Sequence, residues 1–283
     1  MNARLSCAID SATTLLAEAG IDSARYDAEE LAAHLAGTER LRLSMLDAPD
    51  DTFFDHYRAS IAERSRRVPL QHLTGIAAFG PLTLSVGPGV FIPRPETEAM
   101  LEWATAQCLP DAPLIVDLCT GSGALALGLA RHRPDARVIG VDDCDTALGY
   151  ARTNAAGSTV ELLHADVTAP GALSELDGQV DLLVSNPPYV PDGAALEPEV
   201  LDHDPSHAVF GGPDGMTVIT ALVGLAGRLL RPGGLFAVEH DDTTSALTVE
   251  LLDRTAAFDD IVPQRDLTGR PRFVTARRKG EHP

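Results

Sequence analysis

A rigid segment rich in hydrogen-bond acceptors, Asn186-Pro187-Pro188-Tyr189, directly follows an apolar run that ends at Ser185. Its prolines lack a backbone N–H and fix φ, so the segment is stiff. A primary amide or an exocyclic amine carries two hydrogens, which the side-chain oxygen of Asn186 and the carbonyl of Pro187 are suited to accept. With both hydrogens held, the nitrogen lone pair points toward an electrophile, and Tyr189 offers a flat face for a planar amide or base. The competing interpretation is a proline-rich loop that only ends a strand.

The loop Asp117-Leu118-Cys119-Thr120-Gly121-Ser122-Gly123-Ala124 lies between a predicted strand and a predicted helix. Its glycines allow the backbone to approach a ligand closely, and the helix N-terminus offers unpaired N–H groups. Asp142, nineteen residues after Gly123 and at the end of the next predicted strand, is placed to accept hydrogen bonds from ribose hydroxyls. Because Gly121-x-Gly123-x-x-Ala126 also fits a dinucleotide fingerprint, the loop predicts an adenosine-type cofactor without identifying it. A tight turn without a ligand is the alternative.

The charge balance of the 283-residue chain is strongly acidic, with 22 Lys and Arg against 41 Asp and Glu and a net charge of −19. Such a surface repels phosphate groups, which disfavours general nucleic-acid and anionic-membrane binders. Apolar runs do not reach the length of a membrane span, and the first ten residues lack the apolar core of a signal peptide. The cysteines form no Cys-x-x-Cys pair, so neither a zinc site nor a disulfide framework is indicated. We therefore expect a cytoplasmic protein.

The hydrophobic spacing changes along the chain. Residues 1–75 show helical spacing only, with predicted helices that end at Gly20, at Gly37 and before Pro69. Alternation over residues 82–86 then predicts a short hairpin acting as a hinge. The remaining chain alternates between predicted strands at 114–118, 137–141, 160–164, 180–185, 235–239 and 273–276 and predicted helices at 122–132, 145–156, 215–230 and 244–256. This pattern predicts an α/β fold, a doubly wound, mostly parallel sheet with a small N-terminal helical domain, whose ligands lie at the carboxyl ends of the strands.

These segments resemble those of the release factor glutamine (N5) methyltransferases, a family of S-adenosylmethionine-dependent enzymes with a Rossmann-like class I fold. The tetrapeptide Asn186–Tyr189 is similar to the target-nitrogen motif of amino methyltransferases. Together with Pro93-Arg94-Pro95-Glu96-Thr97-Glu98, it is far more specific than the glycine loop alone. The resemblance covers nearly the whole chain and is weakest over residues 1–65. It is carried by the segments Pro69–Gly75, Pro88–Glu98, Asp117–Gly123, Asn186–Tyr189, Pro205–Gly215 and Leu230–Gly234.

The resemblance implies transfer of a methyl group from S-adenosylmethionine to the side-chain amide nitrogen of the glutamine in the Gly-Gly-Gln motif of peptide chain release factors. It implies a helical substrate-recognition domain at 1–75, the hairpin hinge at 76–95 and the methyltransferase domain at 96–283. The implied catalytic residues are Asn186, Pro187 and Tyr189, and the implied substrate-binding residues are Asn186, Pro187, Pro188 and Tyr189. The implied cofactor-binding residues are Cys119, Thr120, Gly121, Ser122, Gly123, Asp142, Val167 and Asn186.

The chain departs from the family pattern at two places. The segment Glu239–Thr244 lacks a glutamine that many relatives carry nearby, which leaves its role open. Cys119 stands where glycine is common, and we expect a small buried thiol without a reactive role. His203 and His207 are spaced as a helical metal-binding pair would be, but Pro205 between them breaks such a helix, so no metal is expected.

The expected partner is the release factor itself, without direct nucleic-acid or membrane contact, and the protein is expected to be a monomer. The nearest alternative is methylation of a ribosomal-protein glutamine at the same kind of site. Adenine-N6 methylation of DNA or RNA shares the tetrapeptide, but the net charge of −19 disfavours it. A nicotinamide-dependent dehydrogenase would account for the glycine loop and Asp142 but not for Asn186–Tyr189. A non-catalytic binding module would predict a damaged cofactor loop.

Overall fold

The computed structural model describes residues 2–280. The terminal residues Met1 and 281–283, which the predicted domains 1–75 and 96–283 include, lie outside the described residues. Within the described part of the chain, no helix is both long and apolar enough to cross a membrane.

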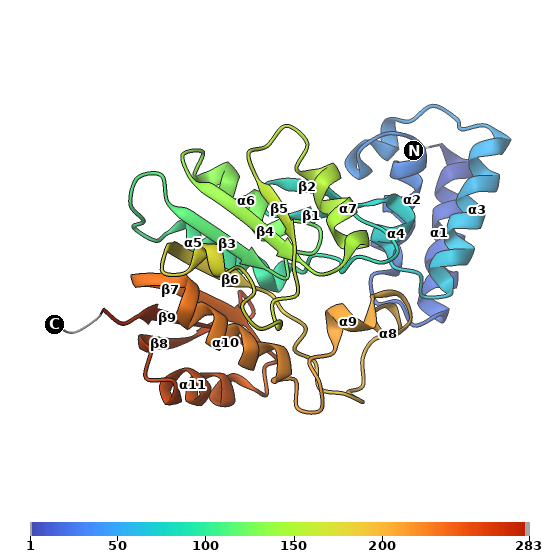
Figure 1. Ribbon diagram of the computed structural model, residues 1–283. Helices are drawn as coiled ribbons and strands as arrows, with labels where there is room; N and C mark the ends of the chain where they lie inside the picture. Colours follow the sequence, from blue (N-terminus) through green and yellow to red (C-terminus); the bar gives the residue numbers. More distant parts are fainter. Residues whose placement is uncertain (1, 281–283) are drawn as a thin grey trace. The chain divides into compact units, whose positions relative to one another are not determined.

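The described residues form two compact units. The helical unit comprises the chain up to residue 76 together with residues 196–203, and the sheet unit comprises residues 77–195 and the chain from residue 204 onward. Figure 1 labels the elements of both units. The helical unit contains α1 (Ala3–Glu18), α2 (Ala24–Leu35), η1 (Arg40–Met45), α3 (Asp51–Ser65), α4 (Leu70–Thr74) and α8 (Pro198–His203).

Apolar side chains at helical spacing form the core of the helical unit. Leu5 and Ile9 of α1 are fully buried, and they belong to one cluster with Leu31 of α2 and Tyr57 of α3. The hydroxyl of Tyr57 donates to the carbonyl of Ala28 at 2.9 Å, which satisfies the polar end of an otherwise apolar side chain. The three predicted helices are confirmed. The elements η1, α4 and α8, each six residues or shorter, were not predicted, because segments this short show no periodicity.

Arg64 of α3 connects distant parts of the helical unit. Its guanidinium donates to the carboxylate of Asp27 at 2.7 Å, and both side chains are buried. The same guanidinium donates to Glu199 of α8 at 2.9 Å, and Arg67 reaches Glu199 at 2.6 Å. Buried charges are tolerated when they are paired and hydrogen-bonded in this way. These ion pairs explain why α8, 135 positions away from Arg64, belongs to the helical unit.

The main sheet has the strand order β5-β4-β3-β6-β7-β9-β8 among the described residues. Neighbouring strands from β5 to β7 pair in parallel, whereas β9 pairs antiparallel with both β7 and β8. The strands are β3 (Leu114–Leu118), β4 (Arg137–Asp142), β5 (Glu161–His164), β6 (Val180–Ser185), β7 (Leu230–Glu239), β8 (Phe258–Arg265) and β9 (Pro271–Arg278). The mostly parallel doubly wound sheet is thereby confirmed.

Two features of the sheet unit differ in detail from the predicted elements. Strand β7 begins at Leu230, five residues before the predicted start. Its pairing with β6 is irregular in this added part, between Val180 and Leu182 of β6. Strand β8 was not predicted, because it is an edge strand with mostly exposed polar residues and Pro263, which a central strand would not tolerate. The predicted hairpin is present as β1 (Ile76–Phe79) and β2 (Leu82–Ser85), and its role as a hinge stays a prediction.

Helices cover both faces of the main sheet (Figure 1). Alternate residues of β3 show this directly, since Ile115 packs in one core cluster with α5 and α6 and Val116 packs in another with α10 and α11. Such alternation is expected for a strand buried on both faces. The helical elements of the sheet unit are η2 (Pro95–Thr97), α5 (Glu98–Thr105), α6 (Ala124–His132), α7 (Asp145–Asn154), η3 (Ser174–Leu176), α9 (Ser206–Val209), α10 (Thr217–Leu229) and α11 (Ser245–Arg254).

Candidate functional site

The candidate site lies at the carboxyl ends of β3, β4 and β6. Strand β3 lies between β4 and β6, so the chain winds in opposite directions on its two sides and opens a crevice there. The register pairs Leu118 with Val141 on one side and with Ser185 on the other. The residues that follow these strands therefore meet at one edge of the sheet. Together they line a pocket with residues of η2 and α9.

The glycine loop turns sharply from β3 into α6. Cys119, Gly121 and Gly123 all have left-handed backbone conformations, with φ of 59°, 57° and 87°. The backbone N–H of Thr120 donates to the carbonyl of Val141 at 2.9 Å, which attaches the loop to β4. This conformation favours glycine, so the non-glycine residue at position 119 is the one that carries strain.

Asp142, the last residue of β4, holds the glycine loop in place. One carboxylate oxygen accepts from the N–H of Gly121 at 2.8 Å, and the other accepts from the N–H of Cys144 at 3.0 Å. Burial raises the pKa of Asp142 above its ordinary value. A carboxylate oxygen can accept more than one hydrogen bond, so Asp142 can shape the loop and still accept a ligand hydroxyl in the pocket that it lines.

Asp117 is a fully buried acid beneath the same loop. Its Oδ2 atom accepts from the hydroxyl of Thr120 at 2.6 Å and from the N–H of Ala126 at 3.1 Å. Its Oδ1 atom has no hydrogen-bond partner among residues 2–280, although the residue lines the pocket. Burial raises the pKa of Asp117 to about 7. A donor or a positive charge on a ligand would therefore be stabilised at this position.

Hydrogen bonds orient the side chain of Asn186, the first residue after β6. Its Nδ2 atom donates to the hydroxyl oxygen of Thr97 at 3.0 Å, and the hydroxyl of Thr97 donates to Glu239 at 2.8 Å. The hydroxyl of Tyr189 donates to the second carboxylate oxygen of Glu239, also at 2.8 Å. Because the nitrogen of the Asn186 amide is bound to Thr97, its oxygen is the end left for a ligand.

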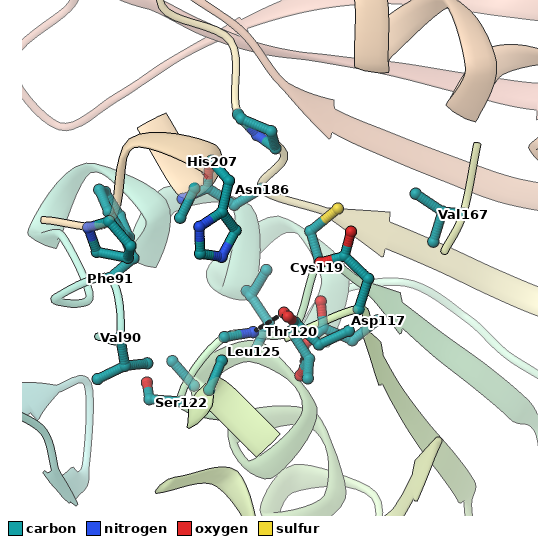
Figure 2. A pocket seen from close by; sticks show the side chains of 18 of the residues that line it. Val90, Phe91, Asp117, Cys119, Thr120, Ser122, Leu125, Val167, Asn186 and His207 are labelled. Atoms are coloured by element: carbon teal, nitrogen blue, oxygen red, sulfur yellow. Dashed lines mark hydrogen bonds between the residues drawn. The ribbon is translucent and has the colours of Figure 1, made fainter. Parts of the chain in front are cut away.

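The structure brings most of the predicted site residues to one pocket. Figure 2 shows Asn186 and Val167 on opposite sides of the view, with Cys119 and Asp117 between them. The predicted residues that line the pocket are Cys119, Thr120, Gly121, Ser122, Asp142, Val167, Asn186 and Pro188. The lining does not include Gly123, Pro187 or Tyr189. Gly123 precedes α6, Pro187 is buried, and the ring of Tyr189 packs against the core while its hydroxyl binds Glu239.

Thr97 and Glu239 are site residues that sequence reasoning does not single out. Thr97 lies in the Pro93–Glu98 segment, where the acids at 96 and 98 are the more conspicuous residues; both of these lie in first helical turns. Glu239 begins the segment whose role the sequence left open. One signal was available, because the register pairs Ser185 with Val238 and so brings Asn186 and Glu239 together at neighbouring strand ends.

Two further expectations concern individual side chains. The Cys119 side chain is half-buried and lines the pocket, and so is more exposed than expected, because the loop turns it toward the site. Desolvation raises the pKa of its thiol far above the ordinary value, and its lack of reactivity stays a prediction. Pro205 separates α8 from α9, so His203 and His207 do not share a helix, and His207 lines the pocket. Within the described residues, no group of three or more potential metal ligands occurs.

Two family models match parts of the chain. A model described as the PrmC N-terminal domain matches residues 8–75, and one described as the methyltransferase small domain matches residues 96–203. A release factor glutamine methyltransferase from Mycobacterium tuberculosis is 68% identical over 280 residues, which cover 98% of this chain and 92% of that protein. One from Mycobacterium leprae is 66% identical over 283 residues, which cover 99% of this chain and 98% of that protein.

A solved methyltransferase structure from Pyrococcus furiosus matches with a TM-score of 0.53 and 17% identity, over 80% of this chain and 99% of that one, which supports the fold. Identity above 60% over almost the full length is far beyond what a shared fold alone produces. The chain belongs to the release factor glutamine methyltransferase family.

Proposed function

We propose that this protein transfers the methyl group of S-adenosylmethionine to the side-chain amide nitrogen of the glutamine in the Gly-Gly-Gln motif of peptide chain release factors. The observation that carries the proposal is the orientation of Asn186. Its amide nitrogen is bound to Thr97, which leaves a fixed acceptor oxygen beside the pocket behind the glycine loop. The family relatives named above support the same substrate.

The pocket suits a cofactor that carries positive charge and a ribose. Asp142, Asp143 and Asp166 line it, and the buried Oδ1 atom of Asp117 lacks a partner among the described residues. S-adenosylmethionine carries a sulfonium and an ammonium group, both of which an acidic pocket stabilises. In this proposal Asp142 accepts the ribose hydroxyls, the loop from Cys119 to Gly123 lies against the cofactor, and Val167 contributes apolar contact. When bound, the cofactor supplies an electrophilic methyl group.

The protein's contribution to the reaction is to orient a poor nucleophile. The lone pair of an amide nitrogen is shared with its carbonyl, so its attack on carbon needs accurate positioning. The oxygen of Asn186 and the carbonyl of Pro187 accept the two N–H hydrogens of the substrate glutamine and turn its nitrogen toward the methyl group. Pro188 contributes to the wall of the pocket, and Tyr189 anchors the end of the tetrapeptide through the bond of its hydroxyl to Glu239. After transfer the nitrogen bears an extra acidic proton, which can leave to water without a dedicated base.

The helical unit is the proposed recognition surface for the release factor. The described residues 2–75 contribute nothing to the lining of the pocket described above, and the segment matched by the PrmC N-terminal domain, residues 8–75, lies within the predicted domain 1–75. The hairpin at 76–95 is the proposed hinge and residues 96–283 the methyltransferase domain. We therefore expect the protein substrate to be selected by the helical unit and the glutamine to be methylated by the sheet unit.

A side-by-side methylation assay tests the proposed function. The purified protein and labelled S-adenosylmethionine are incubated with one candidate substrate at a time. The candidates are a release factor, the same release factor with its Gly-Gly-Gln glutamine replaced by Glu, a mixture of ribosomal proteins, and DNA. Label is expected only in the release factor that retains the motif glutamine, and mass spectrometry should place one added methyl group on that glutamine. Label in ribosomal proteins or DNA, or equal label in the Gln→Glu release factor, would contradict the proposal.

A further inference from the structure

Glu239, the last residue of β7, is a buried carboxylate that binds one end of the tetrapeptide directly and the other end through Thr97. One of its oxygens accepts from the hydroxyl of Tyr189 at 2.8 Å. The other accepts from the hydroxyl of Thr97 at 2.8 Å, and the hydroxyl oxygen of Thr97 accepts from Nδ2 of Asn186 at 3.0 Å. A single carboxylate therefore links the first and the last residue of the tetrapeptide.

The direction of each hydrogen bond in this chain is determined by Glu239. An ionised carboxylate can only accept, so the single hydroxyl hydrogen of Thr97 is directed toward it. The oxygen of Thr97 then presents lone pairs to Asn186 and can bond only to the NH₂ end of the amide. If the amide turned over, its oxygen would face the oxygen of the buried Thr97 hydroxyl with no hydrogen between them, so the hydrogen bond would be lost and two acceptors would face each other.

We propose that Glu239 is a positioning residue that acts through Thr97 to hold the Asn186 amide with its oxygen available to the substrate, and through Tyr189 to hold the other end of the tetrapeptide. This inference rests on the proposed function, since it gives the Asn186 oxygen the task of accepting a hydrogen from the target amide. Without Glu239, Thr97 could donate to the amide oxygen, and the amide would present its NH₂ group to the substrate nitrogen.

The buried surroundings of Glu239 make its negative charge energetically costly, which a side chain with only a packing role would avoid. The side chain is 1% exposed, and burial raises the pKa of Glu239 to about 7 even though Thr97, Tyr189 and the positive charge of Arg272 favour the ionised form. An uncharged side chain would avoid this desolvation penalty. The carboxylate is, however, the group that can accept from two hydroxyls at once and so determine the direction of both hydrogen bonds.

Substitutions at Thr97 test the inference without removing a charge. Thr97→Val replaces the hydroxyl by a methyl group of similar size, and Thr97→Ser restores the hydroxyl. We expect kcat for release factor methylation to fall about ten- to a hundredfold in Thr97→Val, because the amide loses its preferred orientation, and to recover to within about fivefold of wild type in Thr97→Ser. The affinity for S-adenosylhomocysteine should stay within about twofold in both. Thr105→Val is the matched control, because it removes the hydroxyl of another threonine, the last residue of α5, which donates only to the backbone carbonyl of Glu102.

A double-mutant cycle distinguishes positioning from a general structural role. In an Asn186→Ala background, Thr97→Val should cost less than about twofold further in kcat, because the side chain that Thr97 positions is already absent. Glu239→Gln should slow kcat in the wild-type background, and its effect should be smaller when Thr97→Val is already present. A purely structural role would make the losses multiply and would lower the melting temperature in parallel.

The results separate this inference from the proposed function. Suppose that the wild type methylates the release factor. The inference alone would then be overturned by any of three results: an unchanged kcat in Thr97→Val, losses that multiply in the double-mutant cycle, or a loss of activity caused only by weaker cofactor binding. If the wild type methylates a different protein amide, the proposed substrate is wrong, and the same cycle measured on that amide still decides the role of Glu239. If the wild type methylates no amide, both fail.

Discussion

Glu239→Gln should make the protein more stable at pH 8 while it slows methyl transfer. Burial raises the pKa of Glu239 from its ordinary 4.5 to about 7, which corresponds to an unfavourable free energy of about 3 kcal/mol for keeping the carboxyl ionised in the folded protein. Gln removes this penalty but loses one of the two hydrogen bonds that Thr97 and Tyr189 donate, which costs about 1.5 kcal/mol. The net gain of about 1–2 kcal/mol should raise the melting temperature by a few degrees.

The predicted stability difference between wild type and Glu239→Gln depends on pH. Between pH 4.5 and about 7 the unfolded chain has released a proton that folded Glu239 still holds, so wild-type stability falls as the pH rises through this window. Gln does not titrate, so the advantage of the variant should be absent at pH 5 and fully present at pH 8. Asp117, whose pKa is also raised to about 7, titrates in the same window but contributes equally to both proteins.

Calorimetry of the thermal unfolding of wild type and Glu239→Gln at pH 5 and pH 8 measures the stability difference. In the same proteins, kcat for release factor methylation is measured at pH 8. A variant that is less stable than wild type at pH 8, or a stability difference that is the same at both pH values, would refute the reasoning. So would a variant that is both more stable and equally active, because Glu239 would then have no positioning role.

Three other substitutions or reagents test separate parts of the account. Asp142→Ala should weaken S-adenosylhomocysteine binding at least tenfold in calorimetry, whereas tight NAD binding by the wild type would contradict the cofactor assignment. Cys119 lines the pocket and is half-buried, but its raised pKa disfavours the thiolate, so it should react with a thiol reagent more slowly than the exposed Cys7 and Cys108, and labelling of Cys119 as fast as theirs would contradict an unreactive thiol. Arg64→Ala leaves Asp27 buried without its cation, so it should destabilise the helical unit by about 3–5 kcal/mol and reduce release factor methylation. Unchanged methylation in that variant would argue against recognition by the helical unit.

The predictable part of the site is the part that depends on local spacing. The glycine loop follows β3 and Asp142 ends β4, the next strand along the chain. Because parallel strands bring their carboxyl ends to one edge of the sheet, their meeting in the pocket follows from the order of the elements. Asn186 could be placed in the same way, because it follows the strand on the other side of β3. The proline-rich sequence also indicates the stiffness of the segment that it begins.

The remaining part of the site depends on tertiary structure. Thr97 and Glu239 are 142 residues apart, and their hydrogen bond forms only because η2 packs at the end of β7. A threonine beside two acids in a first helical turn gives no local signal of this kind. Strand β8 was missed for a related reason, since its polar residues are permitted only by an edge position that sequence does not reveal. The inclusion of 196–203 in the helical unit likewise depends on the ion pairs of Arg64 and Arg67.

The most direct test of the account is the single-turnover rate of methyl transfer to the release factor at saturating S-adenosylmethionine, measured for wild type, Asn186→Ala and Asn186→Asp. Removing the oriented acceptor in Asn186→Ala should slow transfer by roughly a hundredfold, which corresponds to about 3 kcal/mol. Asn186→Asp keeps an acceptor oxygen but loses the donor to Thr97, so its rate should lie between those of Ala and wild type. Affinity for S-adenosylhomocysteine should stay nearly unchanged in both variants. Equal losses in the two variants, or losses explained by cofactor affinity alone, would show that Asn186 is structural and would contradict the account.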